Sequence, residues 1–297
     1  MQLMFENARR GLLYTLLGLA ALTAACDAQV ATGDAAQTPR LYVFDGGVLA
    51  SDPTRYRLTE AEVGETSLSI AAYLIVHPRG VLLWDAGAVA DAERIGGVGT
   101  EQRLVRADGQ ERFVKLGPPL LDQLASAGYS PSDVTLLALS HHHWDHTADA
   151  NAFAHATWLV RQIERDVMFG AEPPGGARPE TYTALANSHT VIITDEEHDV
   201  FGDGTVIIKH APGHTQGHQV LYVRLAKTGG VVLSGDLYHY TQERTLERLP
   251  TFEFSEEQTR ASRADIEEFL SRTGAALWIQ HDLTAHRMLK KAPEFYD

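Results

Sequence analysis

Residues 140–146 read SHHHWDH, so four histidines and an aspartate occur within six residues, directly after the apolar run at 134–139. That run is short, and a turn signal rich in Ser, Pro and Asp precedes it, so it predicts a buried strand. Alternate side chains of an extended backbone point the same way. We therefore expect His141 and His143 to share one metal ion while His142 points elsewhere. Asp145 and His146 follow where the chain turns, and can serve a second ion.

Three further ligand-type residues each follow a predicted strand. His214 comes after the run at 205–209, Asp236 after 230–233 and His281 after 275–279. A purification tag would be terminal, longer and free of the Trp-Asp interruption. A chance histidine cluster on a solvated loop would not be accompanied by this series. The sequence therefore predicts a metal site assembled from several strand ends.

The motif His141-x-His143-x-Asp145-His146 followed by His214, Asp236 and His281, with Asp85 upstream in WDAG, resembles the metallo-β-lactamase superfamily from about residue 41 to about residue 286. The resemblance implies an α+β fold, a single-domain αββα sandwich over 41–297, with the metals at one edge between the sheets. It also implies that His141, His143 and His214 hold one metal. Asp145, His146 and His281 would hold the other, with Asp236 bridging both and Asp85 supporting the ligands from beneath.

The chemistry of such a site is hydrolysis. Two divalent ions roughly 3.5 to 4 Å apart share a water, lower its pKa and polarise the electrophile. The expected ligands are nitrogen and oxygen only, a set that accepts zinc, iron, cobalt or manganese. We expect two divalent ions, with zinc as the default.

Charge and length restrict the remaining options. The 297 residues carry a formal net charge of −14, which disfavours nucleic acid as a partner because a polyanion needs a basic surface. The predicted ligands spread from residue 141 to residue 281, so most of the chain must close around one site. The sequence leaves the oligomeric state open, with a homodimer as one option.

The N-terminus predicts export. Arg9 and Arg10 precede an apolar stretch at 11–25 that suits a signal-peptide core, and residues 22–26, LTAAC, resemble a bacterial lipobox. We expect a signal peptide over 1–26, a lipid anchor on Cys26 as the only membrane contact, and a flexible tether over 27–40. The protein would then be a periplasmic or membrane-anchored lipoprotein. The alternative is ordinary signal cleavage and a soluble exported protein.

Hydrophobic patterning predicts a layered fold in which strands dominate each half of the chain. Predicted strands lie near 41–45, 69–76, 80–84, 134–139, 156–160, 190–194, 205–209, 218–225, 230–234 and 275–279. Predicted helices lie near 117–127, 147–153, 161–168, 256–272 and 283–290. The connections at 91–116 and 169–189 are long enough to be lids over the site or plain surface excursions.

Within the superfamily, the chain looks most like the secreted or lipoprotein branch of the N-acyl-homoserine lactonases. Class B β-lactamases lack an aspartate at the bridging position, which is Asp236 here. Glyoxalase II carries a helical domain after its last histidine, whereas 16 residues follow His281. The resemblance implies that a hydroxide bridging two metals opens the lactone ring of an acylated substrate. The alternatives are hydrolysis of a thioester, phosphotriester or other ester on this scaffold, and a non-enzymatic periplasmic zinc-binding lipoprotein.

Substrate contacts are the least defined part of the resemblance. The better-known lactonases place a tyrosine three residues after the bridging aspartate, where this chain has His239 between Tyr238 and Tyr240. We expect His239 or Tyr238 to hydrogen-bond the carbonyl oxygen, and Asp145 to pass a proton to the leaving oxygen. Candidates for an apolar groove around the acyl chain are Phe113, Val114, Met168, Phe169 and Phe252.

Overall fold

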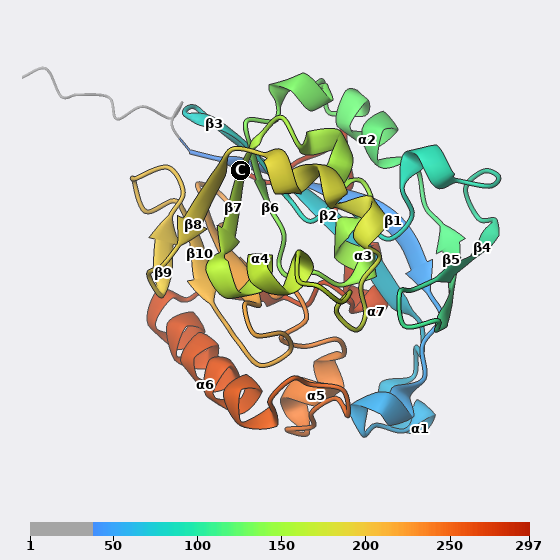
Figure 1. Cartoon of the computed structure of the whole chain (residues 1–297). Helices are drawn as coiled ribbons and strands as arrows, with labels where there is room; N and C mark the ends of the chain where they lie inside the picture. Colours follow the sequence, from blue (N-terminus) through green and yellow to red (C-terminus); the bar gives the residue numbers. More distant parts are fainter. Residues whose placement is uncertain (1–37) are drawn as a thin grey trace, which may run out of the picture. The chain divides into compact units, whose positions relative to one another are not determined.

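The computed structural model describes residues 38–297, which belong to one compact unit. The predicted signal peptide, Cys26 and most of the predicted tether lie outside these residues. Two sheets and their covering helices form the layers of an αββα sandwich (Figure 1). Within the described residues, no helix is both long and apolar enough to cross a membrane.

The larger sheet has the strand order β4-β5-β1-β2-β3-β6-β7-β8. Its strands are β1 (Arg40–Leu49), β2 (Leu68–His77), β3 (Gly80–Trp84), β4 (Glu101–Val105), β5 (Glu111–Leu116), β6 (Leu136–Ala138), β7 (Thr157–Arg161) and β8 (Thr190–Ile193). The smaller sheet has the order β13-β12-β11-β10-β9. Its strands are β9 (Glu197–Asp199), β10 (Val206–His210), β11 (Gln219–Leu225), β12 (Gly229–Leu233) and β13 (Ala276–Trp278).

Helices α2 and α4 pack on the larger sheet, and α6 packs on the smaller one. The α-helices of the described residues are α1 (Glu60–Val63), α2 (Leu120–Ser126), α3 (Trp144–Thr147), α4 (Gln162–Met168), α5 (Thr241–Thr245), α6 (Glu256–Thr273) and α7 (Leu283–Met288). Helix α6 begins at the cap Ser255, whose side chain accepts from the Gln258 N–H, and ends at Gly274 in the left-handed region. Its buried Ile266 and Phe269 pack on the smaller sheet.

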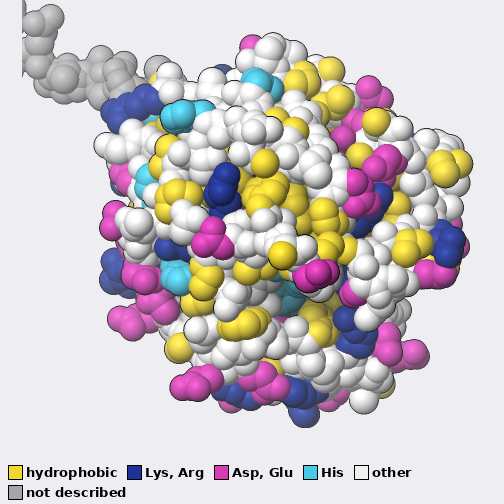
Figure 2. Space-filling model, in the orientation of Figure 1, with side chains coloured by type: hydrophobic (Ala, Val, Ile, Leu, Met, Phe, Trp, Pro, Cys, Tyr) yellow, Lys and Arg dark blue, Asp and Glu magenta, His cyan; other side chains and the backbone are white. Residues whose placement is uncertain are grey.

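Strand β1 shows why the larger sheet lies between two apolar layers. Leu41 and Val43 enter the core between the sheets, whereas Tyr42 and Phe44 enter the core beneath α2. Both faces of the strand are apolar because both faces are covered, and successive side chains alternate between them. Figure 2 shows Lys and Arg side chains interspersed with Asp and Glu over one face of the molecule.

Parallel pairing brings the ligand-bearing loops together. Strand β6 is parallel to β3, so Asp85 and the histidine motif leave the same edge of the larger sheet. Strand β13 is parallel to β12, so Asp236 and His281 leave one edge of the smaller sheet. Loops beyond the carboxyl ends of parallel strands meet at one place, which explains why each ligand follows a strand.

Most predicted elements are present, with three corrections. The connection at 91–116 is not a loop, because it contains the β4–β5 hairpin, and β5 pairs with β1. The helix predicted at 147–153 is replaced by α3 and a short turn at Ala150–Phe153, because the chain must bend where the ligands leave it. Strand β9 and the short helices α1 and α5 were not predicted, and the three residues Glu-His-Asp of β9 carry no apolar pattern.

Candidate metal centre

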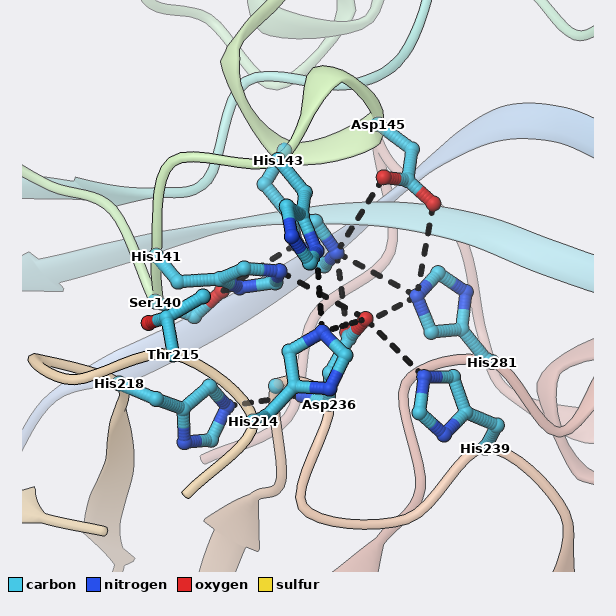
Figure 3. A network of polar contacts seen from close by, with 12 residues as sticks. Ser140, His141, His143, Asp145, His214, Thr215, His218, Asp236, His239 and His281 are labelled. Atoms are coloured by element: carbon cyan, nitrogen blue, oxygen red, sulfur yellow. Dashed lines mark hydrogen bonds and ion pairs between the residues drawn. The ribbon is translucent and has the colours of Figure 1, made fainter. Parts of the chain in front are cut away.

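The seven predicted ligands lie together as two groups (Figure 3). The first group is His141, His143, His214 and Asp236, and the second is Asp145, His146 and His281. Within each group the ligand atoms are within 4.8 Å of one another. Every one of these side chains is buried except that of His143, which is partly exposed. The chain therefore brings two clusters of metal-ligand type to one place.

Asp236 lies between the two groups. Its Oδ2 is 3.3 Å from His214 Nε2 and 3.6 Å from His141 Nε2. Its Oδ1 is 3.0 Å from both His146 Nε2 and His281 Nε2. One carboxylate oxygen thus faces each group, which is the arrangement that a bridging ligand requires.

The buried imidazole nitrogens of the ligand histidines are placed to bind cations and not to hydrogen-bond to one another. His214 Nε2 lies 3.0 Å from His143 Nδ1, and His281 Nε2 lies 3.3 Å from His146 Nε2. Two imidazole nitrogens that converge at such distances repel unless a proton or a metal ion lies between them. Within residues 38–297, buried His141 Nε2 has no hydrogen-bond partner. Two divalent ions would satisfy all of these atoms, so the residues present fit a dimetal site.

Electrostatics favour the metal-binding forms of some of these side chains, whereas burial at His146 and His214 is outweighed by nearby carboxylates, chiefly Asp236 at the first and Glu253 at the second, so that the pKa of each of these two histidines is raised. Burial and the neighbouring His146 lower the pKa of His141 well below its usual value, which keeps this imidazole neutral. Burial opposes ionisation of Asp236, but His281 and His146 outweigh it and lower its pKa. Neutral imidazole and ionised carboxylate are the forms that bind metals.

Outer hydrogen bonds fix the ring orientation of the ligand histidines. His146 Nδ1 is 2.9 Å from Asp85 Oδ2, and His214 Nδ1 is 3.0 Å from Glu253 Oε1. His281 Nδ1 donates to a backbone carbonyl oxygen at 2.7 Å. Each contact leaves the opposite ring nitrogen, Nε2, facing the centre. Asp85 was predicted as such a support, whereas Glu253 was not.

A glycine makes room for His143. A Cβ on Gly176 would lie 2.4 Å from the Cδ2 atom of the His143 ring, and Gly176 has φ +81°, a conformation that other residues rarely adopt. The Gly176 carbonyl also accepts from the Trp144 backbone N–H at 2.9 Å. The loop after α4 therefore packs on the histidine motif because this residue has no side chain.

A buried glutamate on α4 ties two ligand loops together. Glu164 is 3% exposed and accepts hydrogen bonds from the His142 backbone N–H at 2.9 Å and the Gly217 N–H at 2.9 Å. It also contacts His142 Nδ1 at 2.5 Å and the Thr215 hydroxyl at 3.0 Å. His142 thus points away from the metal centre, and its ring binds a residue that holds the loop carrying His214.

His218 holds the backbone of the bridging residue. Its Nδ1 donates to the Ala211 carbonyl oxygen at 2.8 Å, and its Nε2 accepts from the Asp236 backbone N–H at 2.9 Å. These two bonds require a neutral ring, and burial and the nearby His214 lower its pKa to about 4. This role was not predicted from the sequence, although His218 lies only four residues after His214 of the Pro-Gly-His motif.

Of the three candidates after Asp236, His239 alone lines the cavity at the metal centre. Its Nε2 is 3.1 Å from Asp236 Oδ2, and its ring stacks on that of His281. The Tyr238 hydroxyl donates to Glu267 at 3.2 Å, and the Tyr240 hydroxyl donates to the Thr66 carbonyl oxygen at 2.6 Å. Both tyrosines therefore point away from the cavity.

Comparison with known proteins agrees with this geometry. The family model of the metallo-beta-lactamase superfamily matches residues 66–272. The chain belongs to the metallo-beta-lactamase superfamily. It is similar to N-acyl homoserine lactonase AttM of Azorhizobium caulinodans, with 28% identity over 271 residues that cover 87% of this chain and 98% of that protein. It is also similar to N-acyl homoserine lactonase AiiA of Bacillus thuringiensis subsp. kurstaki, with 25% identity that covers 77% of this chain and 87% of that protein.

Solved structures of superfamily members share the fold. A variant of B. thuringiensis AiiA with N-decanoyl-L-homoserine bound at its active site aligns with a TM-score of 0.72 and 22% identity, covering 87% of this chain and 99% of that one. AidC, a dizinc quorum-quenching lactonase in complex with a product, aligns with a TM-score of 0.61 and 18% identity, covering 88% of this chain and 95% of that one.

The cavity over this metallo-beta-lactamase centre has a volume of about 290 Å³ and differs from the predicted apolar groove. Phe252 lines it, but Val114 and Met168 are buried in the core, and Phe169 packs against the core from a partly buried position. Phe113 is 41% exposed, because it occupies the outward-facing register of β5. Polar side chains of the β4–β5 hairpin line the cavity instead.

Proposed function

We propose that this chain is a dimetal lactonase that opens the ring of N-acyl-homoserine lactones. The observation that carries the proposal is Asp236, which presents one oxygen to each of two histidine-rich groups at the floor of a cavity. The curated relatives named N-acyl homoserine lactonase AttM support the substrate class, because the alignment spans 98% of their length. We propose zinc as the native metal, with iron, cobalt and manganese as the alternatives that a nitrogen and oxygen ligand set accepts.

Two divalent ions held by these residues supply an activated water and a Lewis acid for the ester carbonyl. Asp145 lines the same cavity, and its Oδ2 lies 3.8 Å from His281 Nε2. We assign Asp145 two roles, metal ligand and carrier of the proton to the ring oxygen as that oxygen leaves.

His239 is the side chain that we assign to the carbonyl oxygen. It lines the cavity beside Asp236, and its Nδ1 lies 3.3 Å from Glu243 Oε2. The Glu243 carboxylate also accepts from the His239 backbone N–H at 2.5 Å, which holds the backbone in place, and the ring stacks on that of His281. A fixed donor stabilises an oxyanion without reorganising during the reaction.

The test is a substrate panel. Metal-loaded protein should acidify a weakly buffered solution of N-hexanoyl-homoserine lactone, and chelator-treated protein should not. The proposal is contradicted if the metal-loaded protein leaves lactones of several acyl-chain lengths intact and hydrolyses a thioester or a phosphotriester instead. Asp236→Ser should lower both metal content and rate, whereas Asp122→Ser, an exposed aspartate on α2, should leave both unchanged.

We also propose that the protein is exported and lipid-anchored through Cys26. Support comes from the basic, apolar and LTAAC pattern of residues 1–26. Mass spectrometry of protein purified from membranes should find a lipid on Cys26 as the first residue, and Cys26→Ser should release the protein. Recovery of wild-type protein in a soluble exported fraction, cleaved near residue 26 and without lipid, would favour the alternative.

A further inference from the structure

Three arginines line the cavity above the metal centre. Arg55 comes from the short helical turn Pro53–Tyr56, and Arg106 and Arg112 come from the β4–β5 hairpin. All three are partly buried. Residues far apart in the sequence thus place three guanidinium groups around one opening in a chain whose formal net charge is −14.

Two of these positive charges lack an acidic partner. Arg106 forms an ion pair with Asp108 in the hairpin turn. Arg112 donates to neutral acceptors, the Glu111 carbonyl oxygen at 2.8 Å and Gln110 Oε1 at 3.0 Å. The guanidinium carbon of Arg55 lies 4.4 Å from the centroid of the Phe252 ring. Over the described part of the chain, neither Arg55 nor Arg112 has a carboxylate within 4.0 Å.

The strand register makes Arg112 an unusual residue for its position. The side chains of β5 alternate, so Arg112 shares its face with the buried Val114 and Leu116, and it pairs with Leu104 of β4. An apolar residue is expected on that face. Burial, together with Arg106 and Arg55, lowers the pKa of Arg112, although Asp145 and Asp108 oppose the shift. Mutual repulsion and lost hydration oppose this arrangement, so structure alone gives no reason for it.

The hairpin is held over the cavity. The Ala107 backbone N–H donates to the Ala177 carbonyl oxygen at 3.0 Å, next to Gly176 of the loop that packs on His143. The Arg106 N–H closes the turn by donating to the Gln110 carbonyl oxygen at 3.0 Å. Backbone contacts therefore set where the hairpin that carries Arg106 and Arg112 lies.

Building on the proposed function, we infer that the preferred substrate is a homoserine lactone whose acyl chain ends in a carboxylate. A neutral alkyl chain would desolvate the guanidinium groups without replacing their lost hydration. A carboxylate would pair with them, with two parallel hydrogen bonds to one arginine. Leu49, Leu68 and Phe252 also line the cavity and suit the methylene groups between the lactone and the carboxylate.

The experiment compares two substrates of equal size. The first substrate is N-adipoyl-homoserine lactone, whose acyl chain ends in a carboxylate. The second is the same molecule with a neutral carboxamide in place of that carboxylate. Metal-loaded wild-type protein should show a kcat/KM at least about tenfold higher for the carboxylate, as expected for one charge-assisted hydrogen bond. The preference should shrink between about 0.01 M and about 1 M NaCl, where the Debye length falls from about 30 Å to about 3 Å.

Two variants and a control assign the effect to these residues. Arg112→Gln and Arg55→Gln should each lower the ratio of kcat/KM for the carboxylate to kcat/KM for the carboxamide about tenfold. Arg103→Gln is the control, because Arg103 lies on β4 with a 57% exposed side chain paired to Glu111, outside the cavity lining. The preference is the ratio of two kcat/KM values measured on one preparation. A loss of folded protein lowers both values equally and leaves this ratio unchanged.

The outcomes are distinguishable. Equal or better turnover of the carboxamide by wild-type protein overturns the inference and leaves the lactonase proposal standing. The inference also fails if the variants keep the preference and only weaken inhibition by the ring-opened product, because the arginines would then hold the product carboxylate. If the protein opens none of the three substrates (the adipoyl lactone, its carboxamide and N-hexanoyl-homoserine lactone), the lactonase proposal fails, and the inference fails with it.

Discussion

Removal of the Glu164 carboxylate should loosen both ligand loops at once. Glu164→Ala would leave the backbone N–H groups of His142 and Gly217 buried without an acceptor. Each such orphaned group costs about 1 to 3 kcal/mol, so we expect the free energy of unfolding to fall by about 2 to 6 kcal/mol. Glu164→Gln keeps one acceptor oxygen and should lose about half as much.

Urea unfolding in the presence of chelator measures this loss without the contribution of bound metal. Glu172→Ala, an exposed glutamate in the loop after α4, is the control and should change the free energy of unfolding by less than about 0.5 kcal/mol. A loss below about 1 kcal/mol for Glu164→Ala would refute the claim that this carboxylate joins the two loops.

Three further predictions concern other parts of the site. Glu253→Gln should weaken metal binding about 10- to 100-fold in chelator competition, because the His214 ring loses its charged partner; unchanged affinity would dismiss that role. Gly176→Ala should displace His143 and reduce metal content, whereas Gly175→Ala, whose Cβ would meet nothing within 4 Å, should not; equal metal content in both would contradict the packing argument. Burial and Asp91 raise the pKa of Asp149 from 3.8 to about 7, so the folded state binds an extra proton between these values and stability falls as pH rises through them. The free energy of unfolding of Asp149→Asn should therefore exceed that of wild type by up to about 4 kcal/mol at about pH 8 and by little at about pH 4. If the free energies of unfolding of the two proteins change in parallel with pH, the prediction is refuted.

The sequence predicted that His214, Asp236 and His281 converge with the histidine motif, because each comes directly after an apolar run and ligands of one site must meet. Hydrophobic patterning predicted a layered fold rich in strands. The αββα arrangement of the layers and the supporting role of Asp85 were predicted from the resemblance to the superfamily. The supporting residues Glu164 and Glu253 carry no such signal. Each is one acidic residue among many, and only tertiary packing places it against a ligand loop.

One part of the cavity was predictable from a signal that the sequence contains. Asp108-Gly109 lies between two alternating runs, which is the turn chemistry of a hairpin, so the β4–β5 hairpin could have been found. Which of Tyr238, His239 and Tyr240 faces the cavity had no such signal, because this segment forms a turn and bends, where side chains do not alternate as they do along a strand. The convergence of Arg55 with Arg112 had no sequence signal, because the helical turn Pro53–Tyr56 and the hairpin meet only in the folded chain.

The proposed lactone hydrolysis depends most on a site that holds two metal ions at once. Metal-free protein titrated with zinc, while base uptake records the opening of N-hexanoyl-homoserine lactone, tests this directly. We predict that hydrolysis remains low up to one equivalent per chain, rises up to two and then stays constant, and that Asp236→Ser removes the second step. Full activity at one equivalent, or lactone opening by metal-free protein, would contradict the dimetal mechanism.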